Sequence, residues 1–143
     1  MLRLTKQTDY GIVLLTYIGN KPIDTAWTAR GLADITGIPP AMVGKILKIL
    51  TRSELLISQR GAQGGYRLAR DPKQISVGDI VLSLDGPPAL TDCLSAQNYD
   101  CIVDSCSLQP SWRRINNAIH DALNEITLHE MAELQNCNCC SDA

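Results

Sequence analysis

The sequence has no phenylalanine, and only two tryptophans and four tyrosines among 143 residues. Because 45% of the residues are nevertheless hydrophobic, leucine, isoleucine, valine and alanine have to fill the core, as is usual in helical proteins. A chain of this length and composition forms one compact domain, or a small domain with an appendage, rather than a disordered chain. The sequence therefore predicts a mainly α fold.

Long hydrophobic runs are also missing. No apolar stretch approaches the roughly 18 residues that a membrane-spanning helix needs, and residues 1–6 lack the apolar segment of a secretory signal. We therefore expect a cytoplasmic protein with no membrane partner. Cysteines stay reduced in that compartment, so the six cysteines are interpreted as metal ligands or redox groups before disulfides.

A strong net charge is absent as well, since the formal value is −2. The two halves nevertheless differ. Residues 1–70 have ten Lys or Arg against four Asp or Glu, a balance of +6, whereas residues 71–143 have three against eleven, a balance of −8. This asymmetry is typical of a basic, phosphate-facing module joined to an acidic regulatory part.

Three helices are predicted in the basic half, over about 8–19, 28–36 and 39–52. Gly37 ends the second, and Pro39-Pro40 begins the third. Two short helices joined by a tight glycine-containing turn form the helix-turn-helix unit, whose second helix enters the major groove of DNA. The buried stripe of the third helix is predicted to contain Val43, Ile46, Leu47 and Leu50.

The opposite face of the third helix has the composition of a DNA-binding surface. It carries Ala41, Gly44, Lys45 and Lys48. The small residues permit close approach to a duplex, and the lysines supply contacts to phosphates or base edges. The alternative is a solvated polar face on an ordinary helix, because helix pairs are common.

A predicted hairpin strengthens the DNA-binding interpretation. Residues 56–60, 61–65 and 66–69 have the pattern of strand, glycine-bearing turn and strand. Arg60, Arg67 and Arg70 place positive charge around a thin tip that could reach a minor groove. A hairpin that only caps the domain is less favoured because three arginines flank it. We interpret residues 1–85 as a winged helix-turn-helix domain with a two-stranded wing.

The wing is followed by a short fourth helix and then by a loop that contains three cysteines. Ser76, with an acidic residue three positions later, is predicted to cap the helix, which ends at about Asp85. The loop, residues 86–109, contains Cys93, Cys101 and Cys106 in a Cys-x7-Cys-x4-Cys pattern. Thiolates are soft ligands suited to iron-sulfur clusters. Structural zinc stays open, although its sites usually contain closer pairs, and polar neighbours argue against inert buried thiols.

A long amphipathic helix is predicted after Pro110. We expect it to form a homodimer or to pack across the other protomer, with packing on its own domain as the alternative. Thr127 to Glu130 matches a capping box, so a short terminal helix completes the segment 110–135. Its two histidines, His120 and His129, are interpreted as surface or packing residues. The apolar stripe of the long helix is Trp112, Ile115, Ile119, Ala122 and Ile126.

The remaining segment, 136–143, is predicted to be a flexible tail. It contains Cys137, Cys139 and Cys140, which could bind a soft metal, deliver or receive iron, or form a redox pair. An accessory or incidental role is the default interpretation.

Over nearly its whole length the sequence resembles the winged-helix iron-sulfur regulators of the IscR and NsrR type. The resemblance lies in residues 4–11, in the wing residues 60–68 and in the three-cysteine loop. Residues 8–11 and 42–48 resemble most the regulators of the SUF cluster-assembly system. The family implies a homodimer on a two-fold site in double-stranded DNA, and a repressor of SUF iron-sulfur assembly genes. The implied DNA-binding residues are Ala41, Met42, Gly44, Lys45, Lys48, Arg60, Gly64 and Arg67.

The resemblance also implies an iron-sulfur cluster on Cys93, Cys101 and Cys106, with [4Fe-4S] favoured over [2Fe-2S]. The cluster-assembly repressor has a histidine three residues after the last cysteine, where this sequence has Gln109, a poor iron donor. The nitric-oxide sensors instead use an aspartate of the partner's first helix, and the matching residue is Asp9. The alternative is that Asp9 only places an anion in the first helical turn. The sequence departs from the family at three further positions: Met42 and Gly44, where the cluster-assembly repressor has Tyr and Glu, and Gln63, where relatives often have glycine.

Three other functions stay open. A metal-carrying or redox protein without DNA binding would use the tail cysteines, a nitric-oxide-sensing repressor would share the fold, and a winged-helix repressor could hold zinc. No nucleophile and base pair, phosphate loop or paired-carboxylate motif is present in the sequence. We therefore expect neither an enzyme nor a small-molecule substrate.

Overall fold

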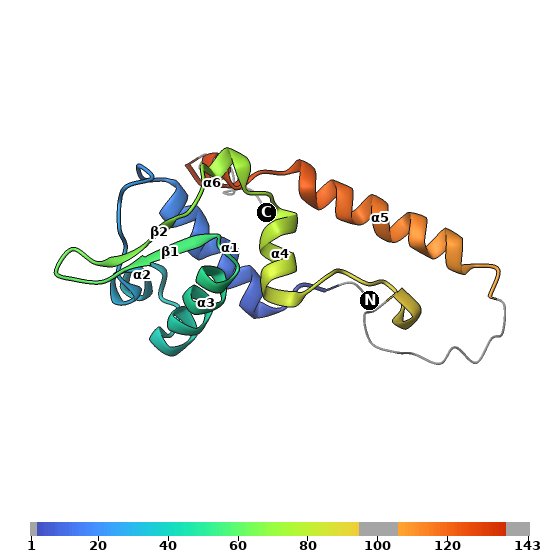
Figure 1. Cartoon of the computed structure of the whole chain (residues 1–143), viewed down its shortest axis with the longest axis horizontal. Helices are drawn as coiled ribbons and strands as arrows, with labels where there is room; N and C mark the ends of the chain where they lie inside the picture. Colours follow the sequence, from blue (N-terminus) through green and yellow to red (C-terminus); the bar gives the residue numbers. More distant parts are fainter. Residues whose placement is uncertain (1–2, 95–105, 137–143) are drawn as a thin grey trace, which may run out of the picture.

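The computed structural model describes residues 3–94 and 106–136. Figure 1 shows α1 to α4, α6 and the hairpin gathered at one end, with α5 extending away from them as an arm. None of the described helices is long and apolar enough to cross a membrane. The elements are α1 (Lys6–Gly19), α2 (Ala29–Thr36), α3 (Pro40–Arg52), β1 (Leu56–Gln59), β2 (Gly65–Leu68), the 3-10 turn η1 (Pro72–Gln74), α4 (Val77–Asp85), the 3-10 turn η2 (Asp92–Leu94), α5 (Gln109–Glu125) and α6 (Leu128–Asn136).

Side-chain caps set the beginnings of several helices. Thr5 accepts a hydrogen bond from the backbone of Thr8, so α1 begins two residues before the predicted position. Thr28 caps α2 through Gly31 in the same way. The predicted capping box at α6 is present, because Thr127 and Glu130 bond reciprocally. Ser76, the predicted cap of α4, also forms a reciprocal box with Asp79. The prediction of a mainly helical fold is therefore confirmed, and so are the predicted caps of α4 and α6.

The core lies where α1, α3, α4 and α6 meet. The predicted stripe of α3 is confirmed, because its four residues are fully buried. Leu14 and Leu15 of α1 and Leu128 of α6 are also fully buried. Burial of a large aliphatic side chain contributes about 1.5–3 kcal/mol, so these contacts hold the terminal helix against the first one despite their separation in sequence.

The hairpin is a regular antiparallel ladder that pairs Leu56 with Leu68 and Gln59 with Gly65. A further bridge joins Trp27 to Tyr66 and extends the ladder on its other edge. Gly65 lies in the strand rather than in the predicted turn. A Cβ there would lie 2.5 Å from the carbonyl oxygen of Trp27, and the φ of +153° is one that side chains disfavour. Gly65 begins the strand because it pairs with Gln59 in the ladder, and the close passage of Trp27 explains why this position requires glycine.

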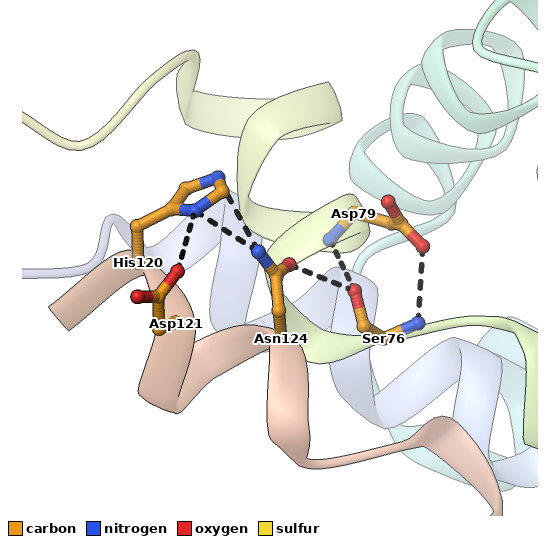
Figure 2. Close-up of polar contacts among 5 residues, drawn as sticks. All are labelled: Ser76, Asp79, His120, Asp121 and Asn124. Atoms are coloured by element: carbon orange, nitrogen blue, oxygen red, sulfur yellow. Dashed lines mark hydrogen bonds and ion pairs between the residues drawn. The ribbon is translucent and has the colours of Figure 1, made fainter. Parts of the chain in front are cut away.

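The arm α5 has the predicted amphipathic sequence, yet none of its residues is buried. The carboxyl-terminal part of α5 packs on α4. The helix therefore packs on its own domain, which was the alternative to dimerisation, at one end only. The junction is polar, as Figure 2 shows: Ser76 Oγ donates to Asn124 Oδ1 at 3.1 Å, and Asn124 Nδ2 lies 3.0 Å from His120 Nδ1. His120 is exposed on α5, and His129 pairs with Glu133 on the surface of α6, so both lie where surface or packing residues are expected.

Gly78 permits this junction, because a Cβ at that position would lie 1.9 Å from Asn124 Oδ1. We expect Gly78→Ala to displace Asn124 Oδ1 from Ser76 Oγ, to lower the free energy of unfolding by about 1 kcal/mol, as the loss of one hydrogen bond does, and to loosen α5. Urea denaturation followed by circular dichroism measures the change. The matched variant Gly44→Ala meets no atom within 4 Å and should stabilise its helix by about 0.5–1 kcal/mol. Equal stabilities of the two variants would contradict the assignment.

Candidate nucleic-acid interface and cysteine loop

The unit formed by α2 and α3 has helix-turn-helix geometry. Gly37 ends α2 in the left-handed conformation, with φ of +73°, and its N–H donates to Ala33. Only residues 37–39 separate the two helices, which pack against one another. The glycine therefore makes the sharp turn that directs α3 outward.

The face of α3 opposite the core is open. Ala41, Lys45 and Lys48 are exposed, whereas Met42 and Gly44 are half-buried. Met42 packs against the edge of the core, so only part of its side chain faces outward. Neither lysine has an ion pair within the described part of the chain. The two charges are therefore available to an external anion.

The hairpin presents the predicted wing residues in different environments. Arg60 is exposed at the start of the turn. Gly64 closes the turn by donating to Gly61 O at 2.9 Å, and a Cβ there would lie 2.4 Å from Gln59 O, so the hairpin itself requires glycine. Arg67 lies 3.7 Å from Asp24 and is about one-third exposed. Of Arg60 and Arg67, Arg60 is therefore the freer.

Two of the three loop cysteines fall within the described residues, and Cys101 lies outside them. Cys93 and Cys106 are half-buried free thiols. Thr91 Oγ1 lies 3.1 Å from Cys93 Sγ, and Leu90 N donates to Asn116 Oδ1 at 3.1 Å, which attaches the start of the loop to α5. Both thiols are accessible enough to act as ligands. The tail cysteines Cys137, Cys139 and Cys140 also lie outside the described residues.

Asp9 lies exposed in the first turn of α1. Among residues 3–94 and 106–136, no group of three His, Cys, Asp or Glu side chains is placed to hold a metal ion. Asp9, Cys93 and Cys106 of one protomer therefore do not form a three-ligand site together.

A clamp between α1 and α4 was missed by the sequence analysis. Asp85 accepts hydrogen bonds from Thr5 N at 3.1 Å and from Thr5 Oγ1 at 2.5 Å. It fastens the helix that carries Asp9 to the residue that precedes the cysteine loop. The available signal was an acidic residue at the carboxyl end of a helix, where the macrodipole disfavours it unless another partner compensates.

The clamp makes an acid-dependent contribution to stability. Burial raises the pKa of Asp85, but hydrogen bonds from Thr5 and Thr8 lower it more, so the net pKa lies below its ordinary value. A depressed pKa stabilises the fold above the unfolded value, and the stabilisation is lost as the pH falls through the folded value. Asp85→Asn should therefore lower the thermal midpoint at pH 7, and the difference should shrink at an acid pH well below the ordinary aspartate pKa of about 3.9. Thermal scans at both pH values measure this, and a pH-independent difference would contradict it.

Comparison with known proteins gives this geometry a family context. A family model described as Rrf2, iron-dependent transcriptional regulator, matches residues 4–134. Protein aau3 of Rhizobium meliloti is 34% identical over 136 residues, which cover 92% of this chain and 86% of that protein. The transcriptional regulator NsrR of Shouchella clausii is 30% identical, with 85% and 78% covered.

Two solved structures have the same fold. CymR, the global cysteine regulator of B. subtilis, matches with a TM-score of 0.75 and 25% identity, over 94% of this chain and 98% of that one. T. potens IscR matches with a TM-score of 0.69 and 25% identity, over 94% and 88%. The family model, NsrR and CymR are each described as regulators rather than enzymes. The winged-helix fold is thereby confirmed, and the chain belongs to the Rrf2 family of DNA-binding, iron-dependent transcriptional regulators.

Proposed function

We propose that this protein is a cytoplasmic, homodimeric repressor whose hold on DNA depends on an iron-sulfur cluster, with SUF iron-sulfur assembly genes as its target. One observation carries the proposal: the same chain has an open helix face with two exposed lysines and a loop with half-buried free thiols. The chain also matches a family of iron-dependent regulators. Residues 1–85 would bind DNA, 86–109 the cluster, and 110–135 the partner, with 136–143 as an accessory tail.

The DNA-binding part of the proposal follows from the open face of α3 and from the wing. The helix would enter the major groove, and Arg60 would reach into the adjacent minor groove. Exposed Lys45 and Lys48 supply positive charge. Gly44 leaves room for the duplex, because a Cβ added at this position would have no atom within 4 Å. The proposed contact residues are Ala41, Met42, Gly44, Lys45, Lys48, Arg60, Gly64 and Arg67.

The cofactor part of the proposal assigns Cys93, Cys101 and Cys106 as thiolate ligands and Asp9 of the partner subunit as the fourth. Two accessible thiols on a segment attached to α5, and an exposed carboxylate on α1, are donors that fit such a group. When bound, a cluster, with [4Fe-4S] favoured, would supply an oxidant-sensitive link between the protomers. The clamp from Asp85 to Thr5 would hold the carboxylate-bearing helix in register with the loop.

The dimer part of the proposal rests on α5. Its apolar stripe includes Trp112 and Ile115, which are 39% and 46% exposed in the single chain. A long helix with an uncovered apolar stripe is stabilised by a second copy, because burial removes that surface from water. Two copies of α3 would then be held at the fixed spacing that a two-fold DNA site requires.

The cofactor assignment is tested by purifying the protein without oxygen and measuring its iron, acid-labile sulfide and zinc. The DNA-binding assignment is tested by measuring the affinity for DNA at several salt concentrations. The proposal expects iron and sulfide without stoichiometric zinc, and an affinity that falls steeply with salt. Stoichiometric zinc would instead support a zinc-stabilised repressor. A protein that holds a cluster but does not bind DNA would support the second candidate function, a metal-carrying or redox protein. The tail cysteines favour this candidate. A cluster response confined to nitric oxide would support the nitric-oxide sensor.

A further inference from the structure

A polar cavity lies between the carboxyl-terminal half of α3 and the wing, outside the contacts assigned above except for Lys48. Its volume is about 210 Å³, and it is lined by Lys48, Thr51, Arg52, Ser58 and Tyr66. None of the described carboxylates lines it, although the whole chain has more acidic than basic residues. The cavity is therefore a local concentration of hydrogen-bond donors and positive charge.

The regular geometry of the two elements brings these residues together. Lys48, Thr51 and Arg52 are three and four residues apart, so they share one face of the helix. Ser58 and Tyr66 are direct partners in the ladder, so their side chains lie on the same face of the hairpin. Because α3 packs against β1, the two sets of side chains meet. The cavity thus depends on the winged-helix arrangement.

The donors in this cavity have little else to bind. Thr51 Oγ1 donates to Leu47 O at 2.7 Å and is occupied. Within residues 3–94 and 106–136, the side chains of Lys48, Arg52, Ser58 and Tyr66 have no hydrogen bond or ion pair. An ammonium, a guanidinium and two hydroxyls that converge are suited to the oxygens of a phosphate diester or monoester.

We propose that this cavity binds one backbone phosphate of the DNA beside the major groove, and that Arg52, Ser58 and Tyr66 are DNA-contacting residues. The inference rests on the DNA-binding function of the chain. Lys48 belongs both to the cavity and to the open face of α3, so a duplex that contacts this face passes the cavity. A phosphate held at both α3 and the wing fixes the angle between the recognition helix and the groove.

The test uses the full-length protein and a short duplex of random sequence, because a phosphate contact is independent of base sequence. Arg52→Gln removes the guanidinium, and Tyr66→Phe removes one hydroxyl. Lys73→Gln is the matched control, since it removes one exposed positive charge from η1, away from the cavity. Fluorescence anisotropy between about 50 and 200 mM salt gives the affinity and its salt dependence. Circular dichroism verifies that each variant is folded.

Loss of one phosphate contact should reduce the slope of log affinity against log salt by about 0.9 in Arg52→Gln. Tyr66→Phe should weaken binding several-fold at an unchanged slope, and Lys73→Gln should resemble the wild type. If the wild type binds with a salt slope and both cavity variants match it, the cavity assignment is wrong. If the wild type does not bind DNA, the DNA-binding function itself fails.

A second arm distinguishes DNA from free phosphate as the source of the anion. Inorganic phosphate is added in place of chloride at equal ionic strength, and the thermal midpoint is recorded for the wild type and for Arg52→Gln. The proposal expects no phosphate-specific stabilisation, because Lys48, Arg52 and Ser58 are exposed to solvent and charges in water hold a free anion weakly. Tight, Arg52-dependent binding of inorganic phosphate together with unchanged DNA binding would overturn it in favour of a small-anion site.

Discussion

Cys106→Ala protein purified without oxygen should be colourless, with no visible absorbance and less than about one-tenth of the wild-type iron. The same result is expected for Cys93→Ala and Cys101→Ala, because the loss of one thiolate of three leaves too few soft donors to hold a cluster. Cys93 and Cys106 are half-buried, and neither belongs to the buried core. Their removal should therefore spare the fold, which circular dichroism would verify.

The tail offers a matched control for this experiment. Cys139→Ala removes a thiol outside the proposed ligand set and should keep the full absorbance and iron content. Full cluster occupancy in all three loop variants would eliminate the cofactor proposal. Loss of the cluster in Cys139→Ala as well would assign the tail a ligand role that the proposal does not give it.

Ile115→Asp should convert the protein from a dimer to a monomer of 15.6 kDa. Ile115 is exposed on the arm of the single chain, so an aspartate is tolerated there, whereas a charge buried between two helices is strongly disfavoured. Affinity for a two-fold DNA site should fall on the order of 100-fold, because two linked heads bind far more tightly than one. Analytical ultracentrifugation and DNA titration measure both effects.

Asn117→Asp is the matched control, because it introduces the same charge on the opposite face of α5. It should stay dimeric and bind DNA as the wild type does. A dimeric Ile115→Asp protein, or equal losses in both variants, would contradict the assignment of the apolar stripe to the dimer contact.

The parts of the fold that local chemistry determines could be predicted from the sequence. Ser76 and Asp79 form their box from residues three apart, and Gly37 ends α2 because few other residues adopt its conformation. The stripe of α3 follows from a 3.6-residue period. β2 starts at Gly65 because that residue pairs with Gln59, but its need for glycine could not be predicted, because it depends on Trp27, which lies far away in the sequence.

The candidate site likewise has residues whose position could be predicted from the sequence and residues whose position could not. Lys45 and Lys48 lie on the predicted open face because helical periodicity places them there. The contact between Thr5 and Asp85 joins residues 80 positions apart, and no local pattern encodes that pairing. Ser58 and Tyr66 were treated as ordinary strand residues, since their meeting with Arg52 depends on how the wing packs against α3.

The central claim is that the state of the cysteine-bound cofactor determines the affinity for DNA. The most direct measurement compares cluster-loaded and chelator-stripped protein on the same promoter fragment of the SUF genes, at equal dimer concentration and salt, without oxygen. A coupling of about 1–3 kcal/mol predicts affinities that differ about 5- to 150-fold. Equal retention of the fragment by the loaded and stripped forms would contradict the account.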